Sequence, residues 1–134
     1  MITLDELLSG NDFDDQSPAI QSNIQELLVK VNKIRAAYGK PMYVTSGLRS
    51  LEHHLEIYAK KGITDRARIP MKSRHLSGQA CDVSDPNKEL QKFILSNVKL
   101  LEDSGLYCES FVFTTNWVHF QEVPPLSGRR FFMP

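Results

Sequence analysis

The sequence is poor in cysteine and has no long hydrophobic run. Two cysteines in 134 residues are too few for a disulfide scaffold, and Cys81 and Cys108 lack the paired spacing of a thiolate zinc site. We therefore expect buried free thiols. The apolar runs are far shorter than the about 20 residues that a transmembrane helix needs, so we expect no insertion into a membrane.

The chain also lacks an excess of either charge. Sixteen acidic and sixteen basic side chains balance, whereas nucleic-acid binding depends on clustered lysine and arginine, so we expect no nucleic-acid partner. The acidic amino terminus, MITLDELLSGNDFDD, has neither the basic start nor the apolar stretch of a secretory signal. This predicts a protein made in the cytoplasm without a signal peptide. The length predicts one domain, residues 1–134, and the sequence does not indicate an oligomeric state.

Hydrophobic periodicity and capping signals predict three helices. The first begins with Ser17 as its cap and Pro18 in its first turn, and Gly39 ends it. The second is predicted from a Ser50 cap up to Gly62. The third is predicted from an aspartate-proline pair at 85–86, through Leu90, Phe93 and Ile94, and is ended by Gly105.

Four short segments rich in β-forming residues predict a sheet: PMYVTSG (41–47), QACDVS (79–84), CESFVF (108–113) and WVHFQ (117–121). The last two, separated by the turn-prone residues 114–116, are typical of a hairpin. Residues 63–72 are predicted to be a loop, and the proline-punctuated tail is predicted to pack along the surface. The fold class is therefore α+β, with helices packed on a small, mainly antiparallel sheet.

One histidine and one aspartate on these strands have no place in an apolar core. Side chains alternate along a strand, so Trp117, His119 and Gln121 share one face of the last strand, and Asp82 points away from its apolar neighbours. A buried aspartate needs a partner or a cation. His75 lies seven residues before it, and a metal site of His75, Asp82 and His119 has the ligand types that zinc accepts. The alternative is a loop histidine and an aspartate that hydrogen-bonds a turn.

Other charged residues have competing interpretations. Arg49 follows a predicted strand, and its planar fork suits a carboxylate, although a surface salt bridge is the alternative. His53 and His54 are adjacent on a helix, point about 100° apart and are expected on its solvated surface. Arg129 and Arg130 are expected to be solvated or to anchor the tail.

A ten-residue motif gives these residues a context. The pattern S-x-H-x-x-G-x-A-x-D is matched at every fixed position within SRHLSGQACD (73–82), with VTSGLRS before it and WVHFQ after it. This order of segments resembles the LAS-type zinc peptidases, which include D-alanyl-D-alanine carboxypeptidases, D-Ala-D-Ala dipeptidases and phage L-alanyl-D-glutamate endopeptidases. Their fold is shared with the hedgehog signalling domain. The resemblance runs from about Val44 to Phe120.

The resemblance implies roles for particular residues. It makes His75, Asp82 and His119 the zinc ligands, and it makes Arg49 the residue that engages substrate carboxylate or carbonyl groups. Ser73 is expected to line the same cleft.

The chain departs from the family pattern next to the final ligand. Many family members carry Asp or Glu three residues before the final histidine, where this chain has Asn116, whose amide cannot accept a proton. Asn116 and its neighbour Trp117 are candidate substrate-binding residues. The identity of the general base is therefore open.

Glu109 is the candidate replacement for the missing acid. If residues 114–116 form a three-residue turn, Glu109 comes opposite Gln121 and shares a face with His119. In a two-residue turn Glu109 faces away, and it is then an ordinary exposed strand glutamate. Glu122 is a poorer candidate, because strand alternation places it on the face opposite His119.

The resemblance implies a zinc metallopeptidase that hydrolyses an amide bond in the peptidoglycan stem peptide, of the D,D-carboxypeptidase or the L-Ala-D-Glu endopeptidase type. The single-domain format favours a phage or prophage endolysin that acts on the cell wall after release. The alternative is a catalytically weak or inactive zinc-binding module of the same fold with a structural or wall-binding role.

Overall fold

The computed structural model describes all 134 residues. Five α-helices, one 3-10 helix and five strands follow one another along the chain: α1 (Leu4–Leu8), α2 (Pro18–Tyr38), β1 (Val44–Ser46), α3 (Leu51–Lys60), η1 (Arg66–Arg68), β2 (Ala80–Ser84), α4 (Glu89–Ser96), α5 (Val98–Asp103), β3 (Tyr107–Glu109), β4 (Trp117–Gln121) and β5 (Phe131–Phe132). No helix combines the length and apolarity needed to cross a membrane.

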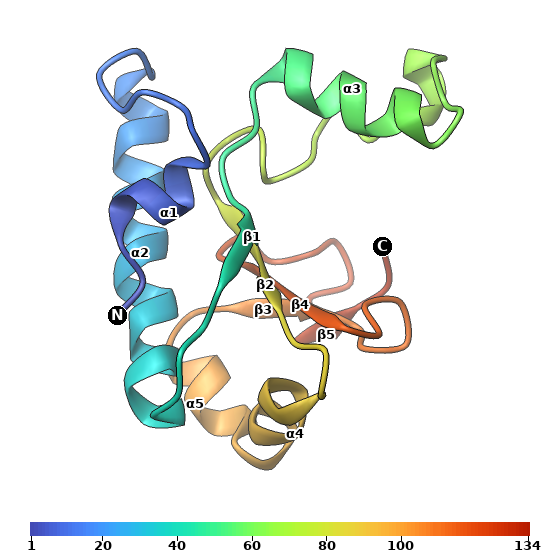
Figure 1. The fold of residues 1–134 in the computed structure, drawn as a ribbon. Coiled ribbons are helices and arrows are strands. Elements are labelled where there is room, and N and C mark those ends of the chain that lie inside the picture. The colour runs from blue at the N-terminus through green and yellow to red at the C-terminus, as the bar shows by residue number, and fades with distance from the viewer.

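The strands form one sheet in the order β1-β2-β4-β3-β5. The first three pairings are antiparallel and the last, between β3 and β5, is parallel, so the sheet is mixed although mainly antiparallel. In Figure 1, α1 and α2 lie along one side of the sheet, α4 and α5 lie near one end, and α3 stands apart at the other end. The predicted α+β class is confirmed.

The core forms between the helices and one face of the central strands. Cys81 and Val83 of β2 and Val118 and Phe120 of β4 have no exposed surface, and they pack with apolar residues of α1 and α2. Alternation along the strands sends the intervening side chains to the opposite face. That face is the one left for polar chemistry.

The helix α2 follows the sequence prediction at both ends. The Ser17 hydroxyl accepts the N–H of Ile20 at 3.2 Å, Pro18 occupies the first turn, and Gly39 ends the helix with a left-handed φ of 74°. Its buried residues recur at helical spacing: Ile24, Leu27, Val31 and Ile34.

The predicted third helix is wrong in its start and in its continuity. It begins at Glu89 rather than at the proline, because the Asp85 carboxylate accepts two backbone N–H groups further along, at 2.9 and 3.0 Å. It also breaks at Asn97, whose side-chain amide donates to the Phe93 carbonyl at 2.8 Å and competes for the helical hydrogen bonds. The region is therefore two helices, α4 and α5.

The predicted hairpin is confirmed by the antiparallel pairing of β3 and β4, but its connection is longer than either the two-residue or the three-residue turn considered. Strand β3 ends at Glu109, and residues 110–116 form a longer loop, which the Gln91 amide holds by donating to the Thr114 carbonyl at 2.6 Å. The observed register pairs Cys108 with Phe120, so the same register brings Glu109 to the position opposite His119. The shift relative to the predicted register is two residues, which preserves the face of every side chain.

The two ends of the chain are more ordered than the sequence suggested. The amino terminus contains α1, closed by a capping box in which the Thr3 hydroxyl accepts the Glu6 N–H at 3.3 Å and the Glu6 carboxylate accepts the Thr3 N–H at 3.2 Å. The tail adds the edge strand β5. Arg130 anchors it by donating to the Leu106 carbonyl at 2.7 Å and by lying 4.0 Å from the centre of the Tyr107 ring.

Candidate metal centre

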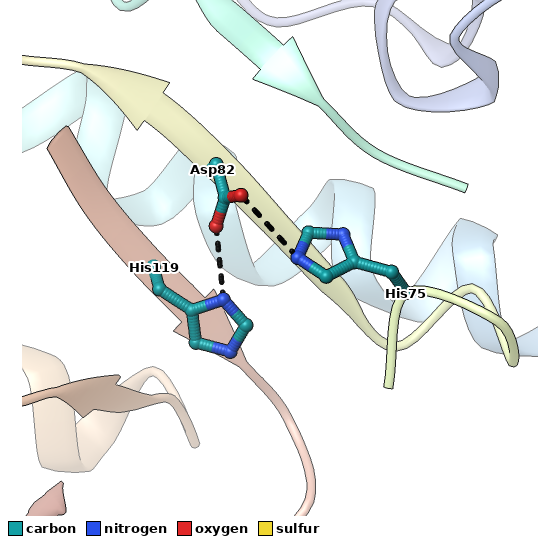
Figure 2. Close-up of side chains that lie close together, drawn as sticks. All are labelled: His75, Asp82 and His119. Carbon is teal, nitrogen blue, oxygen red and sulfur yellow. Dashed lines mark hydrogen bonds and ion pairs between the residues drawn. The ribbon is translucent and has the colours of Figure 1, made fainter. Parts of the chain in front are cut away.

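Two neighbouring strands and one loop bring His75, Asp82 and His119 together. Strand β2 pairs Asp82 directly with His119 of β4, and the loop before β2 carries His75. The Asp82 carboxylate lies 2.9 Å from Nδ1 of His119 and 3.4 Å from Nε2 of His75. Figure 2 marks both contacts with dashed lines. One ligand atom from each residue lies within 4.8 Å of the others, so the three can hold one metal ion.

The main chain fixes the orientation of the His75 ring. Its Nδ1 donates a hydrogen bond to the Gly47 carbonyl at 2.9 Å, so that Nε2 is the nitrogen directed at Asp82. Gly78, with φ of 73°, makes the turn that returns the chain from His75 into β2, and it packs against Ile20 of α2. The side chain of His75 is 4% exposed, so the ring has little freedom to move.

His119 is held in the complementary way. Its Nε2 donates to the Gln121 side-chain oxygen at 3.0 Å, so that Nδ1 is the nitrogen available next to Asp82. The Gln121 amide is itself oriented by donating to the Val123 carbonyl at 2.7 Å. Sequence reasoning placed Gln121 on the face of His119 but missed this role, which two-residue spacing along a strand makes available.

The electrostatics of the cluster favour an ionised aspartate. Burial by itself raises the pKa of Asp82, but hydrogen bonds from His119 and His75 outweigh it and hold the pKa well below its usual range. Burial lowers the pKa of His119, and its hydrogen bond and attraction to Asp82 outweigh this effect and raise it. The interactions that stabilise the carboxylate are those that a cation would also provide.

The donor set fits a zinc ion. Two imidazole nitrogens and one carboxylate oxygen are three protein ligands of the kinds that zinc uses when a fourth position is open to water. Both imidazoles have the outer hydrogen-bond partner that fixes a metal-binding tautomer, the Gly47 carbonyl for His75 and Gln121 for His119. Asp82 bonds these two rings rather than a turn, which excludes the alternative of unrelated loop and turn residues.

Arg49 lies beside the cluster and is not a surface residue. Its Nε donates to the Ser46 hydroxyl at 3.0 Å, and Nη2 lies 3.6 Å from the Asp82 carboxylate. Its Nη1 lies 3.5 Å from Nδ1 of His54. The side chain is 13% exposed, so the arrangement differs from the surface salt bridge that the sequence left open.

The prediction of a solvated His54 is wrong. Its side chain is fully buried, Nε2 donates to the Pro70 carbonyl at 3.0 Å, and the ring meets Tyr58 edge-on with the ring centres 5.1 Å apart. Burial lowers the pKa of His54, so it remains a neutral ring whose Nδ1 can accept from Arg49. Its neighbour His53 is exposed, as expected. The four-residue spacing to Tyr58 was the available signal for a buried face.

The cluster lies in a cleft of about 870 Å³. The cleft is lined by the three candidate ligands and by four other residues singled out in the sequence: Arg49, Ser73, Glu109 and Trp117. The tail closes one side, where the Phe132 ring meets that of His119 at 6.0 Å between centres. No signal in the sequence indicated that the tail would reach the site.

Asn116 lies outside this cleft. It lines a smaller hollow of about 320 Å³ that shares Asp82 and Trp117 with the main cleft. Asn116 therefore does not line the cleft that holds the metal cluster, although its neighbour Trp117 lines both.

Glu109 shares the face of His119, which is one of the two orientations that the sequence left open. It is half-buried, it lines the cleft, and burial raises its pKa, while the charge of His119 lowers it in part. Glu122 lies on the other face of the sheet, where its carboxylate pairs with Lys30 of α2 at 3.6 Å. Glu109 is therefore the one acidic side chain that lines the cleft besides the candidate ligand Asp82.

Comparison with known proteins gives one result. A family model described as Peptidase M15 matches residues 2–121. No curated protein matches the chain significantly, and no solved structure does. The matched range contains every residue placed in the metal cluster and all five α-helices, and it leaves out Met1 and the tail after β4.

Proposed function

Because this chain belongs to the peptidase M15 family, we propose that it is a zinc metallopeptidase that hydrolyses an amide bond in the peptidoglycan stem peptide. The main support for the proposal is the His75–Asp82–His119 cluster, which lines a cleft together with Arg49 and Glu109. The resemblance of residues 73–82 to enzymes that cleave bonds of D-amino acids supports peptidoglycan as the substrate.

The ligand cluster defines where the ion would be held. His75 through Nε2, His119 through Nδ1 and Asp82 through its carboxylate would hold zinc. When bound, zinc polarises a carbonyl and lowers the pKa of water. The Gly47 carbonyl and the Gln121 amide keep both imidazoles in the tautomers that bind.

The remaining steps are assigned to residues that line the cleft. The Glu109 carboxylate takes a proton from the attacking water and passes it to the leaving amine. Arg49, held by Ser46 and His54, presents its guanidinium to a substrate carbonyl or carboxylate, and such a preset donor loses little by reorganisation. Ser73 and Trp117 line the peptide path.

The biological setting extends the proposal. We propose an endolysin of a phage or prophage that is made in the cytoplasm and acts on the cell wall after release. The bond cleaved is either that of a D,D-carboxypeptidase or that of an L-Ala-D-Glu endopeptidase, and the products distinguish the two.

Metal analysis and muropeptide digestion test the proposal together. Protein purified without added metal should contain one tightly bound zinc, and His75→Ala should lose it. Wild type should release a defined fragment from purified muropeptides by mass spectrometry. Glu109→Gln should keep its zinc and lose about 100-fold or more of the rate.

The matched control is Glu122→Gln, which removes a glutamate from the opposite face and should retain full activity. Absence of zinc from both wild type and His75→Ala would refute the metal site. Zinc without any product would favour the inactive wall-binding module, and binding of the protein to insoluble peptidoglycan would then be measured. Full activity in Glu109→Gln would exclude Glu109 as the base.

A further inference from the structure

Positive charge is concentrated in one segment of the chain although the whole chain is neutral. Residues 60–74, which run from the end of α3 to the segment before His75, carry six basic residues and one acidic residue, Asp65. The six are Lys60, Lys61, Arg66, Arg68, Lys72 and Arg74. Sixteen basic and sixteen acidic residues balance over the whole chain, so this segment is a local excess.

Three of these cations line the cleft: Lys61, Lys72 and Arg74, which we call the basic wall. All three are exposed, and none takes part in an ion pair. Lys61 is the one with a defined contact, its Nζ lying 4.9 Å from the centre of the Tyr58 ring. The basic wall therefore presents three uncompensated charges to the same space as the metal cluster.

The acidic residues of the cleft do not neutralise this wall. Asp82 is engaged by both histidines and by Arg49, and Glu109 lies next to His119 on the sheet. A bound divalent cation would add further positive charge. The cleft as a whole is then an attractive environment for an anionic ligand.

The tail supplies apolar lining to the same cleft. The residues concerned are Pro124, Pro125, Leu126, Phe132 and Met133. A ligand in the cleft therefore meets both the cations of the basic wall and the apolar side chains of the tail. The volume of about 870 Å³ is that of a site for a short peptide rather than for an extended polymer.

We propose that the basic wall binds carboxylate groups of the peptide substrate that lie away from the scissile amide, and that it makes the enzyme selective for acidic stem peptides. This inference rests on the proposed function for the cleavage step. Lysine and arginine at an open cleft recognise carboxylates by charge, and the uncharged side of the peptide lies against the tail. The competing interpretation is that the three cations are only solvated side chains.

The test uses one peptide in two forms. The synthetic stem peptide L-Ala-D-Glu-L-Lys-D-Ala-D-Ala is supplied with its carboxyl groups free or converted to carboxamides. Wild type should prefer the free acid, with most of the difference in KM, and the preference should weaken as salt is raised. The triple variant K61Q/K72Q/R74Q should lower kcat/KM for the free acid about tenfold. Loss of one exposed ion pair is expected to lower kcat/KM by up to about fivefold. It should leave the amidated peptide within about twofold.

A control of equal charge separates the wall from net charge. The triple variant K33Q/K88Q/K92Q removes three exposed cations that do not line the cleft and should not change the preference. Zinc content and the melting temperature of both triple variants are measured alongside, so that misfolding is recognised. Because both triple variants remove three positive charges, a difference between them in substrate preference reflects the location of the charges.

The outcomes distinguish this inference from the proposed function. Equal cleavage of both peptide forms by wild type, or an equal loss on both forms in K61Q/K72Q/R74Q, would overturn the basic wall while the peptidase activity remained. If neither form is cleaved, the proposed function fails, and direct binding of the two peptides decides the inference. Tighter binding of the free acid that K61Q/K72Q/R74Q loses would support the wall, and equal binding would refute it.

Discussion

From the buried carboxyl group of Glu122 we predict that the protein loses stability as the pH rises through neutrality. Its side chain is 3% exposed, neither carboxyl oxygen has a hydrogen-bond partner, and the nearest cation is Lys30, with Nζ at 3.6 Å. Burial raises the pKa of Glu122 to about 7 from 4.5, and Lys30 offsets only part of this effect. The ionised carboxylate is therefore disfavoured in the folded protein.

The sign and size of the effect follow from proton linkage. A folded pKa above the unfolded one gives a stabilisation that is complete below pH 4.5 and is lost as the pH rises through about 7. At about 1.4 kcal/mol for each pKa unit, the difference amounts to about 3 kcal/mol of unfolding free energy. Replacing Glu122 with neutral, isosteric glutamine removes the cost of burying the charge.

Unfolding of wild type and Glu122→Gln is followed by calorimetry at saturating zinc, at pH 5 and at pH 8. The two should have similar stability at pH 5. At pH 8 the variant should be more stable by up to about 3 kcal/mol, which corresponds to about 10 °C in Tm. Glu89→Gln, which breaks the exposed pair with Lys40, is the control and should change stability by less than about 1 kcal/mol without a gain at pH 8. An advantage of Glu122→Gln that does not grow between pH 5 and pH 8 would refute the reasoning.

Three further predictions test the residues that support Arg49 and the packing of the core. His54→Leu removes a partner of the Arg49 guanidinium and should lower kcat/KM by about 10 to 100-fold, with unchanged zinc content. An unchanged kcat/KM would show that Arg49 needs no support from His54. Gly47→Ala places a Cβ against the Leu7 carbonyl oxygen and should cost about 2 kcal/mol or more in thermal unfolding, so a variant as stable as wild type would contradict the packing. Both cysteines are fully buried and burial raises the pKa of each thiol, so neither should react with a thiol reagent until the protein unfolds, and rapid labelling of the native protein would refute this.

Much of the fold was predictable because its signals are local. The cap at Ser17, the stop at Gly39 and the alternation along β2 and β4 depend on neighbouring residues, and the structure follows them. Errors arose where side chains compete with the helix for hydrogen bonds. The carboxylate of Asp85 delays α4, and the amide of Asn97 ends it, and neither effect is visible in a hydrophobic pattern.

The candidate ligands were likewise identified by local pattern, whereas their partners were not. His75, Asp82 and His119 were found from a motif and from strand parity. The Gly47 carbonyl that orients His75 lies 28 residues away along the chain, and the carbonyl that binds His54 lies 16 residues away. Contacts at such separations leave no periodic signal, because they depend on how loops pack.

The sequence by itself determined which side chains face which way. Alternation at β2 and β4 separates the core side chains from the metal cluster, and a register shift of two residues left that division intact. Only the tertiary structure decided what surrounds the cluster. It places Glu109 beside His119, buries His54 behind Arg49, and folds the tail and the basic wall against the cleft, because these neighbours come from segments distant in the chain and meet only when the core is packed.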